Sequence, residues 1–326
     1  MVEAPATPAP PIGVGTWAWG NSLLWGYHPD QDRALEACFR HCLARGLRFF
    51  DTADSYGTGR FNGRSEALLG QFAAALPAGS PDRPVIATKL APFPWRLGRG
   101  GFRRAFLASR ARLQGHLDRV QLHWSTARYA PWQEPPLLEG LADLVLAAEV
   151  AELGVSNMGP QRLRRVQAQL AARGVPLTSL QVQFSLLARQ PLEPGGVVEV
   201  CRELGIELIA YSPLALGVLA RPPGPLPALP GGLRGQLFRR LWPAIQPLLE
   251  AMAAIGHGRP GGQAAVALNW CRAHGAMPIV GLRSVPQAQM AAAAGSWTLA
   301  IEERDRLDQA SALCRRGMPA NPFQSP

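Results

Sequence analysis

Short apolar runs alternate with longer amphipathic segments along almost the whole chain. The runs are mostly apolar, as expected for buried parallel strands that are covered on both faces. The longer segments carry apolar residues at helical spacing. Strands are therefore predicted at about 12–16, 49–51, 85–88, 120–122, 153–156, 180–183, 207–211 and 278–280. Helices are predicted at about 30–45, 64–75, 101–113, 136–148, 160–172, 197–204, 237–255, 262–273, 285–294 and 302–314.

Eight strands that alternate with helices predict an α/β protein, a single (β/α)8 TIM barrel. A Pro/Gly-rich insert at 221–235 breaks the alternation, so we expect extra helices after strand seven and again at the C-terminus. The barrel domain should cover residues 11–326 and follow a flexible Pro/Ala tail at residues 1–10.

A doubly wound open sheet is the alternative fold, and its usual sequence signals are missing. Gly13, Gly15 and Gly20 do not have the G-x-G-x-x-G spacing of a dinucleotide-binding turn. Gly57 and Gly63 lie six residues apart instead of five, and arginine follows where a phosphate-binding loop needs lysine. The sequence therefore favours the barrel.

Composition excludes some function classes. The chain has 326 residues, 47% of them hydrophobic, and its formal net charge of +10 comes from scattered arginines. No segment alternates basic with aromatic residues, so we expect no nucleic-acid partner. No apolar run reaches the ~20 residues of a membrane span and no signal peptide is evident, so we expect no membrane association. No helix face is apolar enough to predict an oligomer.

Five cysteines are an odd number without the paired spacing of a metal site or a disulfide framework. Cys38 and Cys42 flank His41 on a predicted helix, but no second ligand pair follows them. We therefore expect packed thiols, no metal and a reducing compartment such as the cytoplasm.

Ionisable residues follow three neighbouring strands at the point where each apolar run stops. Asp51, Lys89 and His123 occupy these positions, and Tyr56 follows Asp51 in a glycine-rich loop. In a parallel barrel the carboxyl ends of the strands carry the chemistry. Lys89 is also the only lysine among 33 basic residues, which indicates that arginine would not serve at this position.

These four residues suit proton donation to a carbonyl oxygen. A free phenol has a pKa near ~10, and an ammonium beside it favours the phenolate and should lower the pKa of Tyr56. A carboxylate at Asp51 would hold Lys89 in place, and His123 could orient the substrate oxygen. Because no side chain supplies hydride, the reaction needs a cofactor.

Two other functions remain open at this point. A lone lysine at a barrel mouth could form a Schiff base, which would make the protein a lyase that uses Lys89. The barrel could also be a regulatory protein that binds a cofactor with little turnover.

The region from about residue 12 to residue 308 resembles the aldo-keto reductases. The resemblance implies that Tyr56 is the general acid/base, that Lys89 and Asp51 tune it, and that His123 positions the carbonyl. The motifs that carry it are Phe50-Asp-Thr-Ala-Asp-Ser-Tyr-Gly57, Ala87-Thr-Lys89, Gln121-Leu-His-Trp124, Gly154-Val-Ser-Asn157, Gln181-Val-Gln183 and Tyr211-Ser-Pro-Leu-Ala215.

The same resemblance implies NADPH across the barrel mouth, with Tyr211 stacked on the nicotinamide ring and Ser156, Asn157 and Gln181 on its amide. Arg283 matches the family's basic residue near the adenosine 2′-phosphate, a dianion that suits arginine. The full set of implied cofactor contacts is Gly15, Thr16, Trp17, Asp51, Ser156, Asn157, Gln181, Tyr211, Ser212, Pro213, Leu214, Gly217, Gly281, Arg283 and Gln287.

Extra tryptophans make the chain most similar to the pyridoxal reductase-like subgroup of plastids and cyanobacteria. This resemblance implies pyridoxal as the substrate and pyridoxine as the product. Trp17, Trp95 and Trp124 follow predicted strands, and each could wall a flat aromatic aldehyde or pack the loops against each other. Pro94-Trp-Arg96, His123-Trp-Ser-Thr126 and Phe184-Ser-Leu-Leu187 also look like this subgroup.

The chain departs from the family pattern at the adenine end of the expected cofactor site. Gln289 and Ala291 replace the usual glutamate and asparagine, and the usual Ile-Pro-Gly after strand eight is Ile279-Val-Gly281. The continuation after Gly217 is Pro-rich instead of Thr-Gly-Lys-Tyr. The adenine contacts are therefore expected to differ from those of the family.

Overall fold

A computed structural model describes residues 11–77 and 79–325 of the protein. The predicted tail at residues 1–10 lies outside the described residues. Eight parallel strands pair in chain order and close into a barrel, because β1 also pairs with β8. The predicted (β/α)8 barrel is thereby confirmed. The strands are β1 Gly13–Gly15, β2 Phe49–Asp51, β3 Val85–Leu90, β4 Arg119–Leu122, β5 Glu152–Ser156, β6 Leu177–Gln183, β7 Glu207–Tyr211 and β8 Ala276–Gly281.

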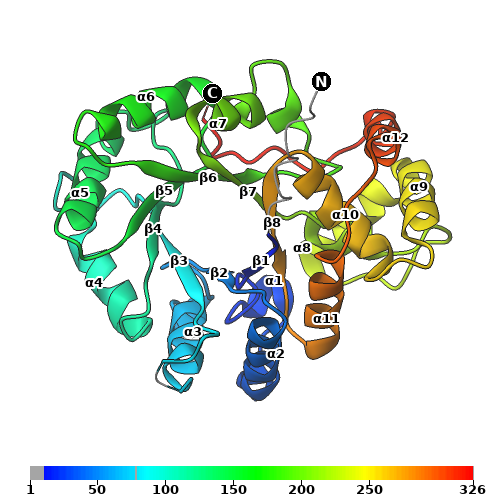
Figure 1. Cartoon of the computed structure of the whole chain (residues 1–326), viewed down its shortest axis with the longest axis horizontal. Helices are drawn as coiled ribbons and strands as arrows, with labels where there is room; N and C mark the ends of the chain where they lie inside the picture. The colour runs from blue at the N-terminus through cyan, green and yellow to red at the C-terminus, as the bar shows by residue number, and fades with distance from the viewer. Residues whose placement is uncertain (1–10, 78, 326) are drawn as a thin grey trace, which may run out of the picture.

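Helices surround the barrel as an outer ring (Figure 1). The α-helices are α1 Ser22–Trp25, α2 Asp32–Ala44, α3 Arg64–Ala74, α4 Arg103–Arg112, α5 Glu134–Leu146, α6 Pro160–Ala171, α7 Val197–Leu204, α8 Gly232–Leu241, α9 Gln246–Gly256, α10 Gly262–Ala273, α11 Val285–Ala294 and α12 Ile301–Ala312. Short 3-10 helices are η1 Pro29–Gln31, η2 Gly59–Phe61, η3 Gln190–Leu192, η4 Ala215–Ala220 and η5 Trp242–Ala244.

Apolar side chains fill two layers. Ile209, Met277 and Ile279 meet Phe49 inside the barrel. A larger cluster joins the outer faces of the strands to the helices and includes the fully buried Trp19 and Trp270. Both layers follow from the apolar strands, since the alternate residues of each strand point inward and outward.

The predicted helix 237–255 is wrong as a single helix. The chain forms α8 from Gly232, then η5, then α9 from Gln246. Pro243 and Pro247 explain the interruption, because proline has no backbone N–H and is tolerated only in the first turn of a helix. The extra helices expected after strand seven and at the C-terminus are present, and α9 and α12 pack with α10 (Figure 1).

Some boundaries also differ from the prediction. Strand β6 begins at Leu177, whereas the prediction began it at residue 180. The prediction missed the first three residues because the polar Thr178 and Ser179 interrupt the apolar pattern. Thr178 Oγ1 donates to the carbonyl oxygen of Leu153 on β5. The short helix α1 was not predicted, although the side chain of Asn21 caps it by accepting a hydrogen bond from Leu24 N at 2.9 Å.

None of the helices in residues 11–77 and 79–325 is both long and apolar enough to cross a membrane. The five cysteines are free thiols, four of them buried and Cys314 half-buried.

Arg119 closes the amino end of the barrel, away from the mouth. Its guanidinium binds Glu152 through Nε and Glu207 through Nη1, each at 2.6 Å, and lies 5.3 Å from the centroid of the Phe49 ring. The Arg119 side chain is only 9% exposed, whereas Glu152 and Glu207 are 40% and 36% exposed, so the two contacts tie β4 to β5 and β7 at the edge of the solvent.

We expect Arg119→Met to lower the free energy of unfolding by roughly 1–3 kcal/mol, because two charge-assisted hydrogen bonds are lost. Urea denaturation measures the change. Arg164→Met is the control, since Arg164 pairs with Glu203 on the exposed surface and its loss should leave the midpoint unchanged. Equal midpoints for Arg119→Met and the wild type would contradict the assigned role of Arg119.

Candidate active site

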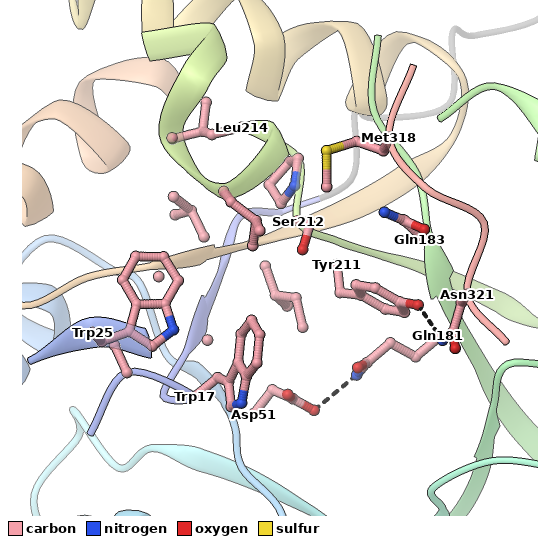
Figure 2. Close-up of a pocket in the computed structure, with 18 of the residues that line it drawn as sticks. Trp17, Trp25, Asp51, Gln181, Gln183, Tyr211, Ser212, Leu214, Met318 and Asn321 are labelled. Atoms are coloured by element: carbon pink, nitrogen blue, oxygen red, sulfur yellow. Dashed lines mark hydrogen bonds between the residues drawn. The ribbon is translucent and has the colours of Figure 1, made fainter. Parts of the chain in front are cut away.

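A cavity of about 900 Å³ opens at the carboxyl ends of the strands. Asp51, Tyr56, Lys89 and His123 all line it, so the structure brings the four predicted residues to one mouth. Figure 2 shows part of its lining, with Trp25 and Asn321 on opposite sides. No group of residues that could hold a metal ion is found in the described part of the chain.

Asp51 and Lys89 form a buried ion pair. Asp51 pairs in register with Ala87, so Lys89, two residues further along β3, points to the same face of the sheet. Lys89 Nζ lies 2.5 Å from Asp51 Oδ2 and 2.8 Å from the carbonyl oxygen of Thr52. The two side chains are 1% and 2% exposed, so the attraction acts with little screening by water.

The second oxygen of Asp51 is also satisfied. Gln181 Nε2 donates to Asp51 Oδ1 at 2.8 Å from across the barrel (Figure 2), and Gln121 Nε2 lies 3.4 Å from the same oxygen. A buried carboxylate needs such partners, because an unpaired buried charge is costly. Strands β2, β3, β4 and β6 thus all contribute to holding one carboxylate.

Tyr56 and His123 lie beside this pair. Lys89 Nζ is 4.9 Å from the centroid of the Tyr56 ring, and the Tyr56 and His123 ring centroids are 5.8 Å apart. Gly57 fixes the loop that carries Tyr56: its φ is +113°, and an added Cβ would lie 1.9 Å from the carbonyl oxygen of Phe61. Only glycine fits this turn.

Burial sets the protonation states of the two rings. Burial raises the pKa of Tyr56 well above its usual value, and the negative charge of Asp51 raises it further. The expected lowering of this pKa by Lys89 is therefore overridden by desolvation. Burial lowers the pKa of His123 well below its usual value, and the positive charges of Lys89 and Arg96 add to the effect. At neutral pH the phenol keeps its proton and the imidazole is neutral.

Polar groups line the cavity next to these rings. Asn157 Nδ2 donates to the carbonyl oxygen of His123 at 3.0 Å, and Asn157 Oδ1 accepts from Tyr211 OH at 2.9 Å. Ser156 and Gln181, which the resemblance assigns to the cofactor amide, also line the cavity. The Tyr211 ring faces the cavity (Figure 2), so a flat ring could stack on it between these amide groups.

The loop after β7 forms the next part of the wall. Four residues that the resemblance assigns to cofactor contacts line the cavity here: Ser212, Pro213, Leu214 and Gly217. The backbone here is unusual, because Ser212 and Leu216 have φ values of +53° and +57° without being glycine. Such conformations cost of order 1–3 kcal/mol each and persist where a ligand-binding shape requires them.

The far end of the cavity is cationic. Arg221, Arg234 and Arg283 all line it, and only Arg283 was predicted. The Arg234 and Arg283 guanidinium carbons lie 4.0 and 5.5 Å from the centroid of the Trp25 ring. Burial lowers the pKa of Arg234, and the charges of Arg283 and Arg221 lower it further. Among the described residues, no carboxylate lies within ion-pair distance of these three arginines.

Sequence reasoning missed Arg234 and Trp25 for different reasons. Arg234 lies in the Pro/Gly-rich insert, where no motif marks it. Trp25 lies in the tryptophan-rich loop after β1, and its spacing did not distinguish it from Trp17, which was predicted and also lines the cavity. The two tryptophan rings contact each other edge to face, with centroids 5.9 Å apart.

Some predicted residues do not line the cavity. Trp95 is 73% exposed and stacks on Phe93 with ring centroids 4.8 Å apart, so the prediction that it walls the substrate was wrong. Thr16 is fully buried and its hydroxyl donates to the carbonyl oxygen of Asp51 at 2.8 Å, facing away from the cavity. Gly15, Gly281, Gln287 and Trp124 do line it.

The two residues that depart from the family pattern at the adenine end lie outside the cavity. Gln289 is exposed and Ala291 is buried in the core, and neither lines the cavity. Gln287 and Met290 of α11 line it instead. Gln287 Oε1 accepts a hydrogen bond from Arg283 N at 2.8 Å, which fixes the turn before α11.

A family model described as the aldo/keto reductase family matches residues 11–312. The chain belongs to this family. It is 46% identical over 322 residues to a chloroplastic pyridoxal reductase of Arabidopsis thaliana, an alignment that covers 97% of this chain and 87% of the relative. The family and subgroup resemblance drawn from the motifs is therefore confirmed.

Solved structures of the family have the same fold. An aldo/keto reductase of Klebsiella pneumoniae in complex with NADP and acetate aligns with a TM-score of 0.70 at 25% identity, over 98% of this chain and 96% of that one. A glycerol dehydrogenase of Gluconobacter oxydans aligns with a TM-score of 0.76 at 20% identity, over 99% and 97% of the two chains.

The buried ion pair predicts strong energetic coupling. Lys89→Met should lower the free energy of unfolding by about 3–5 kcal/mol, because Asp51 would keep a buried charge without its partner. Adding Asp51→Asn removes that charge, so the double variant should lose less than the sum of the single losses. Urea denaturation of the four proteins measures the coupling. Additive losses would show that the two side chains do not depend on each other.

Proposed function

We propose that this aldo/keto reductase uses NADPH to reduce an aldehyde to an alcohol, with Tyr56 as the proton donor and pyridoxal as a substrate. The observation that carries the proposal is the Lys89–Asp51 pair beneath Tyr56, with His123 beside it, at the centre of one long cavity.

The protonation states suit this reaction. Tyr56 keeps its proton until a substrate oxygen needs it, and the nearby Lys89 ammonium stabilises the phenolate that remains after transfer. His123 Nδ1 lies 3.3 Å from Ser55 Oγ, which leaves Nε2 free to contact the carbonyl oxygen. The nicotinamide supplies the hydride when the cofactor is bound.

Three arginines at the cationic end support NADPH. Arg221, Arg234 and Arg283 all line the cavity there. Their positive charges favour an anionic ligand rich in acceptor oxygens. The pyrophosphate and 2′-phosphate of NADPH have this chemistry, and guanidinium groups bind phosphate well.

The opposite end of the cavity supports a flat aromatic aldehyde. Trp124 and Phe323 stack there with ring centroids 4.8 Å apart, next to His123. The Arabidopsis relative named as a pyridoxal reductase is the second support. Reduction of pyridoxal gives pyridoxine.

The Schiff-base alternative is disfavoured by the position of Lys89. Its amine donates to Asp51 and to the carbonyl oxygen of Thr52 and the side chain is 1% exposed, so attack on a carbonyl would first have to break a buried ion pair. The regulatory alternative becomes an outcome of the test below. We also propose a reducing compartment such as the cytoplasm, which the free cysteines support.

The proposal is tested by mixing the protein with NADPH and pyridoxal and following the loss of nicotinamide absorbance. Tyr56→Phe should slow turnover by roughly 10²–10⁴-fold, the usual contribution of a general acid, while NADPH binding remains. Since burial lowers the pKa of His123 and raises that of Tyr56, neither ring should titrate between about pH 6.5 and pH 10, and a fall in turnover within this range would report Lys89, whose pKa burial lowers.

Tyr27→Phe is the control for that substitution, because Tyr27 does not line the cavity and its hydroxyl bonds to Asp32 of α2 and Arg64 of α3. Turnover retained in Tyr56→Phe would reject the assigned proton donor. Reduction of other aldehydes but not of pyridoxal would reject only the substrate. NADPH binding without reduction of any aldehyde would favour the regulatory alternative.

Arg283 should set the preference for NADPH over NADH. Arg283→Ala should weaken NADPH binding roughly 10–100-fold, the value of a lost charge-assisted contact, and leave NADH binding nearly unchanged. Fluorescence titration measures both dissociation constants, with Arg33→Ala on the exposed surface of α2 as the control. Equal weakening of both cofactors would show that Arg283 does not contact the 2′-phosphate.

A further inference from the structure

The C-terminal segment returns from α12 to the barrel mouth (Figure 1). Backbone contacts anchor it at both ends. Met318 N donates to the carbonyl oxygen of Leu187 at 2.7 Å, and Ser325 N donates to that of Asn157 at 3.1 Å. Gly317 packs so closely that an added Cβ would lie 2.7 Å from the Leu187 carbonyl oxygen. Residues 318–323, here called the C-terminal strap, all line the cavity.

Asn321 of the strap completes a closed hydrogen-bond cycle. Its Nδ2 donates to Tyr211 OH at 2.7 Å, as Figure 2 shows, and to Asn157 Oδ1 at 2.8 Å. Tyr211 OH in turn donates to Asn157 Oδ1 at 2.9 Å. The cycle joins the strap to the residues that follow β5 and end β7.

The hydrogen-bond inventory of the cycle explains what Asn321 does. Asn157 Oδ1 accepts from both Tyr211 and Asn321, which uses its two lone pairs. Asn157 Nδ2 donates one of its two hydrogens to the carbonyl oxygen of His123, so the amide cannot turn over without losing bonds. One N–H of Asn157 remains for a ligand in the cavity.

The same contacts hold the Tyr211 ring. Its hydroxyl donates to Asn157 and accepts from Asn321, so the far end of the ring is fixed from two sides. Gln181 keeps a free acceptor, since its Nε2 is bound to Asp51. The cavity therefore offers one oriented amide donor, one amide acceptor and one fixed aromatic face. A carboxamide on a flat ring needs this combination.

We propose that Asn321 is a positioning residue for the nicotinamide end of the cofactor and acts through Asn157 and Tyr211. The C-terminal strap then forms part of the cofactor site. This inference rests on the proposed use of NADPH. It requires that Asn321 influences the nicotinamide half of the cofactor and not the adenosine half, which lies at the arginine end of the cavity.

Binding of two ligands distinguishes an effect on the nicotinamide half from an effect on the adenosine half. NADPH has both, whereas adenosine 2′,5′-bisphosphate has no nicotinamide. Asn321→Ala should weaken NADPH binding roughly tenfold, the value of about one or two hydrogen bonds, and should leave binding of the bisphosphate within about twofold. Titration calorimetry of the full-length chain measures both constants. Turnover at saturating NADPH should fall as well, because the ring would no longer be held in one orientation.

Two further variants test the hydrogen bonds themselves. Asn321→Asp has the same shape but no N–H donor, so it should weaken NADPH binding at least as much as Asn321→Ala. In a Tyr211→Phe background, Asn321→Ala should cost less than in the wild type, since one of its two partners is already absent.

Phe323→Leu is the matched control, because it changes the same strap outside the cycle. Loss of the stack on Trp124 should raise the KM for pyridoxal and leave the dissociation constant of NADPH unchanged.

Equal weakening of NADPH and the bisphosphate in Asn321→Ala would overturn the inference, as would no change in either. Tight binding of NADPH by Asn321→Asp would overturn it too. If the wild-type protein bound neither ligand, the proposed function would fail together with the inference. Wild-type binding of NADPH with an unaffected Asn321→Ala variant would reject the inference alone.

Discussion

The buried ion pair of Lys89 and Asp51 is the interaction on which the rest of the site depends. Two charges at 1% and 2% exposure are stable only when each remaining polar atom finds a partner. The Thr52 carbonyl oxygen, just after β2, and Gln181 of β6 supply these partners. A compact ammonium fits between a carboxylate and a carbonyl oxygen, and this explains why a chain so rich in arginine has a lysine here.

Burial around this pair also gives its two neighbours, Tyr56 and His123, different protonation states. The surroundings that desolvate Lys89 raise the pKa of Tyr56 and lower that of His123. One ring thereby keeps a proton that it can donate, and the other stays neutral and can form a hydrogen bond without adding a second cation. Two residues that titrate far apart are a common arrangement for acid–base catalysis.

The cavity is divided by charge along its length. Arginines gather around Trp25 at one end, and neutral aromatic and amide side chains surround the Tyr211–Asn321 side. The cationic end is built from loops after β1, β7 and β8, whereas the neutral end needs the C-terminal strap. An elongated ligand with phosphates at one end and a flat amide-bearing ring at the other matches this division.

Sequence alone determined the barrel and three of the four central residues, because a residue where a buried apolar run stops must lie at the carboxyl end of its strand. Asp51, Lys89 and His123 are fixed by this local rule. Tertiary packing decided the direction of the Tyr56 pKa, since desolvation depends on everything around the ring and not on Lys89 alone.

Packing also decided which distant residues reach the cavity. It turned Trp95 outward and brought in Arg234 and Asn321, which no motif marks. Asn321 lies 164 positions from Asn157 in the sequence, yet their amides are 2.8 Å apart. Spacing along the chain predicts contacts only within and between neighbouring elements, whereas contacts between distant segments follow from the closure of the barrel and the path of the chain after it.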